Sequence, residues 1–385
     1  MRLSDYIFRT LADWGLRQAF FITGGGAMHL NDALGSEPRI SRLCCLHEQA
    51  CAIAAEAYAR VAGIPAVVSV TSGPGGTNAI TGVAGAWLDS IPMIVISGQI
   101  KTETMISSCP ELKLRQLGDQ ELNITDVVRP ITKYAVAVKK PEEIRYHLER
   151  ACYLAMTGRP GPVWLDIPLD VQAAQIDPGT LAGYDSQEDP LPELNPADVI
   201  AALAKLRTAE RPVIIAGSGV ISAGARELFR SVAQRWNIPV LTAISGIDLL
   251  PSDSPQFFGR PGVMGARAAN FILQNADCLL VLGTRMNLRV IGYDYKNLVR
   301  SGALLHDIVR LQKHHARAGG DIFLQLGYTD ISQVISQHNG LQEVKLNEAA
   351  VVFLADKMTQ ETQRVTVEKR FADSLHKCKR PEALR

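Results

Sequence analysis

Residues 66–78, Ala-Val-Val-Ser-Val-Thr-Ser-Gly-Pro-Gly-Gly-Thr-Asn, set the architecture of this chain. The mostly apolar run at 66–70 predicts a β-strand, because β-branched residues favour the pleated sheet. A glycine turn follows at once at 73–76. Such a turn at the end of a strand either holds a ligand or serves only to end the strand.

Other short apolar runs alternate with longer helical patterns on both sides of this stretch. They predict strands at 19–22, 43–46, 93–97 and 163–167. This alternation is typical of a parallel sheet wrapped by helices. Residues 1–172 are therefore predicted to form an α/β domain.

A second α/β rhythm follows a break in the pattern. Asp, Pro, Gly and Glu crowd together at 173–194, which predicts a linker between domains. Further strands are predicted at 213–216 and 240–242 and within the run 278–285. The predicted fold class is α/β, with two successive parallel-sheet, three-layer domains at 1–172 and 195–340. Residues 341–385 are charged and are predicted to form a helical tail.

Composition narrows the class of ligand. Forty basic residues oppose thirty-nine acidic ones, and no long basic run occurs, so neither nucleic acid nor an anionic membrane is an expected partner. The apolar runs are too short to span a bilayer. Seven cysteines without a C-x-x-C pair predict a protein of the reducing cytoplasm and no metal site. A small neutral or anionic ligand is expected.

Glu48 is a charge within the apolar, alanine-rich stretch 43–55. A carboxylate in such a setting needs a partner and is a candidate functional group. The alternative is a glutamate in the first turn of a helix, stabilised by the helix dipole. Position alone leaves both interpretations open.

Three glycine clusters at the ends of predicted strands raise the question of phosphate binding. Those at 24–26 and 73–76 lack the Lys-Ser/Thr ending of a P-loop. Gly217-x-Gly219 has Ser222 where a dinucleotide fingerprint has its third glycine. A simple strand-to-helix turn and a nucleotide contact both stay open at that position.

Several ordered segments together resemble the thiamine-diphosphate enzymes, and most closely the large catalytic subunit of acetolactate (acetohydroxyacid) synthase. The segments are residues 46–50 (Leu-His-Glu-Gln-Ala), 63–65, 71–78, 82–92, 97–99, 129–133 and 158–162 (Gly-Arg-Pro-Gly-Pro). So many matches in order are specific, in contrast to a lone glycine motif.

The resemblance implies that residues 1–172 grip the aminopyrimidine ring of the cofactor, with Glu48 as the catalytic glutamate. A carboxylate beside the ring would assist proton transfer there. Gln120 matches a family glutamine near the reacting carbon, and the plain alternative is a surface amide. The residues implied on the pyrimidine side are Gly25, Gly26, Gly73, Pro74 and Asn78.

The implied activity is that of an acetolactate synthase-like carboligase or decarboxylase acting on 2-keto acids. Its steps are ylide attack on the keto acid, decarboxylation, and addition to a second carbonyl. Because the family's sites lie between subunits, a homodimer or tetramer is implied as well. Asp119 stands where these enzymes have a phenylalanine, which predicts a more polar substrate pocket.

Residues 195–340 resemble the family's central domain, which in acetolactate synthases binds FAD in a structural role. The implied FAD residues are Arg159, Gly217, Gly219, Gly283, Arg285, Arg289 and Asp307. Leu288 and Met264 depart from an aspartate and a histidine usual in those enzymes. Surface salt bridges are an equally good interpretation of Arg285 and Arg289.

The family's third domain carries a Gly-Asp-Gly motif that helps to hold Mg²⁺ and the cofactor diphosphate. Residues 1–385 of this chain contain no Gly-Asp-Gly motif. A diphosphate without a metal or basic cradle is poorly neutralised. Three interpretations follow: a piece of a full-length carboligase, one subunit of a split enzyme whose partner supplies the diphosphate domain, or a non-catalytic nucleotide- or FAD-binding module. The first is favoured.

Overall fold

The computed structural model describes residues 1–192, 195–287 and 290. These residues form two compact units, which are described separately below. Unit 1 comprises Met1–Asn195 with Ile221–Ala225, and unit 2 starts at Pro196. The predicted FAD residues Arg289 and Asp307 lie outside the described residues, as does the predicted tail at 341–385.

Unit 1 is built on a six-stranded sheet in which every neighbouring pair of strands is parallel. The strands are β1 (Gln18–Phe21), β2 (Ser41–Cys44), β3 (Val67–Val70), β4 (Met93–Gln99), β5 (Tyr134–Ala137) and β6 (Pro162–Pro168), in the spatial order β2-β1-β3-β4-β6-β5. The predicted parallel sheet is confirmed. The prediction missed β5, an edge strand whose side chains are all only partly buried.

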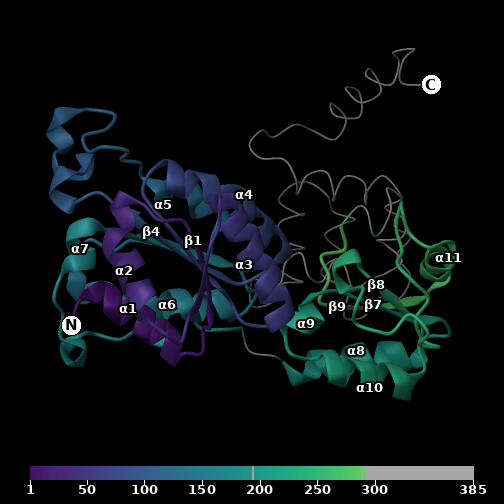
Figure 1. Ribbon diagram of the computed structural model, residues 1–385. Helices are drawn as coiled ribbons and strands as arrows, with labels where there is room; N and C mark the ends of the chain where they lie inside the picture. Colours follow the sequence, from purple (N-terminus) through teal and green to yellow (C-terminus); the bar gives the residue numbers. More distant parts are fainter. Residues whose placement is uncertain (193–194, 288–289, 291–385) are drawn as a thin grey trace, which may run out of the picture. The chain divides into compact units, whose positions relative to one another are not determined.

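Helices cover both faces of this sheet (Figure 1). One core packs α1 (Leu3–Asp13), α2 (Met28–Ser36), α6 (Ile144–Met156) and α7 (Leu169–Ala173) on the sheet. The other core packs α3 (Glu48–Ala62), α4 (Pro74–Asp89) and α5 (Ile124–Val128) on the opposite face. Because β4 and β6 are buried along their full lengths between these layers, they are apolar almost throughout.

The order of the strands in unit 1 reverses between β1 and β3. In an open parallel sheet the loops after two such strands diverge, and ligands bind in the crevice that this leaves at the carboxyl ends. The loops concerned here carry the glycine clusters 24–26 and 73–76. The strand order and the sequence therefore indicate the same two turns as a possible ligand-binding site.

β2 is an edge strand, and all four of its side chains are exposed. The apolar run predicted as a strand at 43–46 is displaced by two residues, and Leu46 beyond the strand is fully exposed. Ile53 and Val61 on α3 are exposed as well, so only one face of this alanine-rich helix is buried. An unpaired edge beside exposed apolar residues is a common site of association.

Unit 2 contains a three-stranded parallel sheet in the order β8-β7-β9. Its elements are α8 (Pro196–Thr208), β7 (Pro212–Ala216), α10 (Arg226–Trp236), β8 (Val240–Thr242), α11 (Arg267–Asn275) and β9 (Cys278–Leu282), and α9 (Gly219–Ser222) starts in this unit. Ala269 and Leu273 of α11 pack against Ile215 and Leu241 of the sheet in one core. The second parallel-sheet unit is thus confirmed. In the described part of the chain, no helix has the length and apolar character that crossing a membrane requires.

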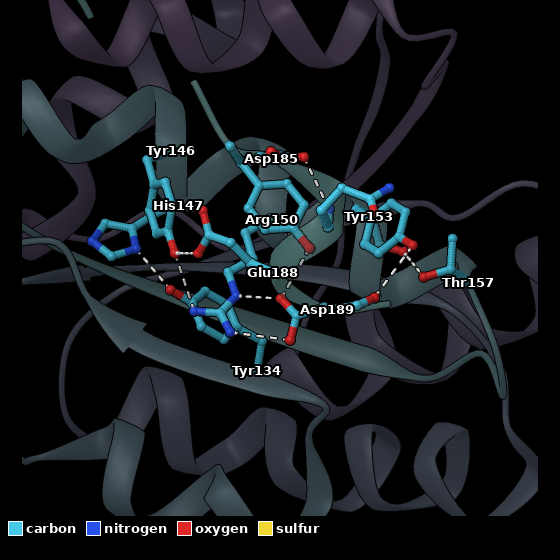
Figure 2. A network of polar contacts seen from close by, with 11 residues as sticks. Tyr134, Tyr146, His147, Arg150, Tyr153, Thr157, Asp185, Glu188 and Asp189 are labelled. Carbon is cyan, nitrogen blue, oxygen red and sulfur yellow. Dashed lines mark hydrogen bonds and ion pairs between the residues drawn. The ribbon is translucent and has the colours of Figure 1, made fainter. Parts of the chain in front are cut away.

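The end of unit 1 is tied back onto α6 by a polar network (Figure 2). Arg150 donates two hydrogen bonds to the carboxylate of Asp189, at 2.8 and 3.1 Å, and these lower the pKa of Asp189. Tyr146 donates to Glu188 at 2.6 Å, and Tyr184 donates to Asp189 at 2.9 Å. Part of the segment 173–194, predicted as a linker, is therefore held against unit 1.

Candidate active site

Glu48 is the first residue of α3, and its side chain is only 9 % exposed. His47 caps this helix, because its Nδ1 accepts a hydrogen bond from the backbone N–H of Gln49 at 3.1 Å. The helix dipole favours a negative charge at this position. A buried carboxylate needs a hydrogen-bond partner. Asn78 of α4 is this partner, because its Nδ2 donates to Glu48 Oε2 at 3.0 Å.

The other carboxylate oxygen of Glu48 faces a glycine. A Cβ atom placed on Gly75 would lie 3.5 Å from Glu48 Oε1. Among the described residues, no donor forms a hydrogen bond with Oε1. One oxygen is thus fixed by Asn78, and the other is available to exchange a hydrogen bond with a ligand.

The turn between β3 and α4 adopts a backbone that requires glycine. Gly73 has φ 55° and ψ −115°, and a Cβ atom at this position would lie 2.3 Å from the backbone oxygen of Gln120. Pro74 follows at the start of α4, where the missing N–H does no harm. Gly73 therefore allows a second segment of chain to lie directly against the turn.

That second segment is residues 100–122, between β4 and α5, hereafter the 100–122 segment. Gln120 itself has a left-handed backbone, with φ 56°. The side chains of Asp119 and Gln120 are both exposed. The structure thus brings Gln120 next to Gly73 through its backbone.

The turn after β1 completes this end of the sheet. A Cβ atom on Gly26 would lie 2.7 Å from Ser72 Oγ, so the turn lies against the residues that precede Gly73. Gln172 fixes it by donating to the carbonyl oxygen of Gly26 at 2.7 Å. Gly25 is exposed, with no atom near its would-be Cβ. The predicted pyrimidine-side residues are therefore grouped at the carboxyl ends of β1 and β3.

Arg159 is not part of this group. Its Nε donates to Ser90 Oγ at 2.7 Å, at the carboxyl end of α4. Twelve residues of helix separate Ser90 from Asn78, which corresponds to about 18 Å. The role predicted for Arg159 in binding FAD stays a prediction.

Two family descriptions match separate parts of the chain. Residues 1–121 match "Thiamine pyrophosphate enzyme, N-terminal TPP binding domain", and residues 199–321 match "Thiamine pyrophosphate enzyme, central domain". The chain belongs to the thiamine pyrophosphate enzyme family. This confirms the resemblance to the thiamine-diphosphate enzymes, since the two cofactor names are synonyms.

Curated relatives of this thiamine pyrophosphate enzyme chain carry one recurring name. The acetolactate synthase large subunit of Lactococcus lactis is 35% identical over 293 residues, which is 75% of this chain and 49% of the relative. Isozyme 1 of Escherichia coli is 36% identical over 289 residues, with 75% and 49% covered. A probable acetolactate synthase large subunit of Methanocaldococcus jannaschii is 35% identical over 314 residues, with 80% and 51% covered. The chain spans about half the length of these relatives.

The glycine turn of the central domain uses its backbone donors internally. Gly217 N–H donates to Leu282 O, and Gly219 N–H donates to Gly283 O, each at 2.9 Å. A Cβ atom on Gly217 would lie 2.5 Å from Gly283 O. These glycines are explained by the close contact of two loops, and their N–H groups are not directed at a phosphate. Arg285 lies three residues beyond β9, at the edge of the described part.

Sequence reasoning missed three polar residues behind the site of this thiamine pyrophosphate enzyme. Gln99 is buried at the end of β4, and Asp166 is buried within β6. The carboxylate of Glu121 accepts hydrogen bonds within the 100–122 segment. The available signal was an aspartate inside the apolar run 163–167, a pattern of the same kind as the one at Glu48. Among the described residues, no cluster of His, Cys, Asp and Glu could hold a metal ion.

Proposed function

We propose that this chain is the pyrimidine-binding and central part of an acetolactate synthase-like enzyme that acts on 2-keto acids as a carboligase or decarboxylase. The observation that carries the proposal is the buried Glu48, with one oxygen fixed by Asn78 at 3.0 Å and the other facing Gly75. The names of the relatives support the same reaction class. Thiamine diphosphate is the cofactor.

The residues at the site fit the aminopyrimidine end of this cofactor. A carboxylic acid can hold or release a proton at a ring nitrogen, and Oε1 of Glu48 is the atom available for this exchange. Asn78 holds the second oxygen and so fixes the orientation of the carboxylate. Gly75 lets α4 pack closely against Thr71, since a Cβ atom at this position would lie 2.7 Å from Thr71 Cγ2. When bound, thiamine diphosphate supplies an electron sink for the carbanion that forms when a 2-keto acid loses carbon dioxide.

The remaining parts of the site are assigned by the same proposal. Gln120, on the exposed side of the 100–122 segment, offers its amide to the substrate, and Asp119 lines the substrate pocket. Mg²⁺ and the diphosphate are held by a further domain of the enzyme, whether on the same polypeptide or on a separate subunit. The enzyme acts as a homodimer or tetramer.

FAD stays outside the catalytic proposal. The backbone donors of Gly217 and Gly219 are used within the protein, so any FAD contact in unit 2 must come from other groups. A flavin absorbance spectrum of the purified chain tests this directly. A bound flavin without turnover of any 2-keto acid would favour the alternative function, a nucleotide- or FAD-binding module.

The decisive experiment replaces Glu48 by Gln and measures turnover of 2-keto acids by the full chain, together with any chain that supplies the diphosphate domain. Removal of the proton-transferring group lowers turnover by about 10²-fold or more. Glu56→Gln is the matched control, because Glu56 lies on the same helix but pairs with Arg60. The proposal is refuted if Glu48→Gln retains full activity, or if the parent protein turns over no 2-keto acid in any assembly.

A further inference from the structure

The 100–122 segment lacks a hydrophobic core of its own. Of residues 101–120, all of which the structure describes, only Met105 is buried. The segment consists of short 3-10 turns that project from the helices of unit 1, visible as the blue part of Figure 1. Hydrogen bonds therefore contribute much of its attachment, among them those of Thr102 to Asp170 Oδ1 and of Lys139 to Ser107 Oγ.

Gln99 contacts both ends of this segment. Its Nε2 donates to the carbonyl oxygen of Leu122 at 2.9 Å, and its Oε1 accepts from the backbone N–H of Ile100 at 3.1 Å. The same Nε2 donates its second hydrogen to Asp166 Oδ2 at 3.0 Å. Gln99 is 1 % exposed, so both N–H groups and the oxygen of its amide form hydrogen bonds inside the protein.

Asp166 is the fixed point behind Gln99. It lies on β6, is 2 % exposed, and is the parallel-sheet neighbour of Ser97 on β4. Ser97 Oγ donates to Asp166 Oδ1 at 2.5 Å, and Trp164 Nε1 donates to Ser97 Oγ at 2.8 Å. Ser97 and Gln99 thus donate to the two oxygens of Asp166, and Trp164 donates to Ser97, so both oxygens of the ionised carboxylate are acceptors.

We propose that Asp166 and Gln99 form a buried clamp that holds the two ends of the 100–122 segment together and thereby positions Gln120 against Gly73. Gln120 lies two residues from the clamped Leu122, and its backbone oxygen contacts the glycine turn. Asp166 acts through Gln99, so it is a positioning residue. The clamp itself follows from the hydrogen bonds, whereas its effect on turnover rests on the proposed function.

The interior of the segment is organised separately. Glu121 accepts hydrogen bonds from the backbone N–H groups of Ile106, Leu117 and Gly118, at 2.7, 3.0 and 3.1 Å. These bonds shape the segment but do not connect it to the sheet. The backbone amides of Ile106 and Gly118 are therefore internal reporters of whether the whole segment is held or released.

The test is hydrogen exchange of the full chain at about pH 8, comparing the parent with Asp166→Asn and Gln99→Ala. Asn keeps the size of Asp but places an N–H₂ group against Ser97 or Gln99, which breaks the match of donors and acceptors. Both variants should raise exchange within the 100–122 segment about tenfold or more, while exchange in α1 and α6 stays unchanged. Ile144→Val is the control, because it removes a methylene from the core of α6 without contact to the clamp.

Two results would overturn the proposal. One is unchanged exchange in the 100–122 segment of both variants; the other is a rise of equal size in α1 and α6, which is simple destabilisation. Exchange does not depend on catalysis, so this outcome is separate from a failure of the proposed function.

Kinetics of the active assembly test the last step of the argument. If the clamp acts by positioning Gln120, adding Gln99→Ala to Gln120→Ala lowers turnover no further than Gln120→Ala alone. Additive losses would refute the link between the clamp and Gln120.

Discussion

The stability of unit 1 should fall as the pH rises from about 4 to about 7, because of Asp166. Burial raises the pKa of this carboxyl from 3.8 to about 7, against the opposing effect of the hydrogen bonds from Ser97 and Gln99. Between these pH values the folded protein keeps a proton that the unfolded chain has already released. The stabilisation is complete below the unfolded pKa and is lost as the pH rises through the folded pKa.

The size of the effect follows from the difference in pKa. A raised pKa of about 7 lies roughly three units above the ordinary value, and each unit corresponds to 1.36 kcal/mol. The free energy of unfolding should therefore fall by about 4 kcal/mol across the whole window. Within the window the slope is about 1.4 kcal/mol per pH unit. Such a change is a large part of the roughly 5–15 kcal/mol that holds a domain folded.

Urea unfolding of the parent and of Asp166→Asn at a series of pH values measures this contribution. With Trp236 of unit 2 replaced by Phe in both proteins, tryptophan fluorescence reports unit 1, where the fully buried Trp164 donates to Ser97 within the same network. Asn does not titrate, and all other groups titrate in both proteins, so the difference between the two unfolding free energies isolates Asp166. Ser69→Ala, which removes a buried hydroxyl from β3 on the far side of β4, is the control and should keep the parent's slope.

The parent should lose about 2 kcal/mol relative to Asp166→Asn between pH values of about 5 and 7. The hydrogen bonds lost in Asp166→Asn lower its free energy of unfolding by a constant amount across this range. They therefore do not change how the difference between the two free energies depends on pH. A difference that stays constant within about 0.5 kcal/mol would show that burial does not dominate at Asp166.

Three further outcomes are expected. Gly73→Ala should destabilise unit 1 by about 1–3 kcal/mol and reduce turnover, because the new Cβ atom would lie 2.3 Å from Gln120 O. Gly35→Ala is the control and should have neither effect, because no atom lies within 4 Å of a Cβ at that position. Urea unfolding and initial rates measure the two effects. Leu46→Asp should dissociate the proposed dimer, as measured by light scattering. Met264→Asp should not, although Met264 of unit 2 is almost as exposed as Leu46. Equal masses of the two variants would exclude the surface around Leu46 as the dimer interface. Asp119→Phe should increase kcat/KM for pyruvate relative to hydroxylated keto acids, and an unchanged ratio would remove Asp119 from the substrate pocket.

Most strands of both units could be predicted because they are short apolar runs that end at a turn. β3 and β4 differ from the predicted limits by one or two residues, since the limits depend on hydrogen bonds that extend past the apolar run. β5 was missed because, as a partly buried edge strand, it lacks a continuous apolar pattern. Local sequence thus predicts the strands with a continuous apolar run well and the partly buried strand β5 poorly.

The sequence suggested residues for the candidate site, and their role stays a prediction, but it gave none of the contacts between them. Glu48 and Asn78 were both identified, yet only the packing of α3 on α4 shows that they are hydrogen-bonded to one another. The clamp was missed for the same reason: Ser97 and Asp166 are 69 positions apart and meet only in the register of β4 with β6. Register between strands so distant in sequence is set by the whole sheet, which no local motif encodes.

The two sides of the site are held by different kinds of force. Glu48 starts a helix whose inner face is buried among apolar residues, so it cannot move without disrupting the core of unit 1. Gln120 belongs to a segment with almost no apolar burial, and a change of about 1.4 kcal/mol in its attachment alters the ratio of held to released segment tenfold. The Gln99 hydrogen bonds to Leu122 and Asp166 are each of about this magnitude. A buried carboxylate on β6 can thus control how often the second side of the site is assembled while the first side stays fixed.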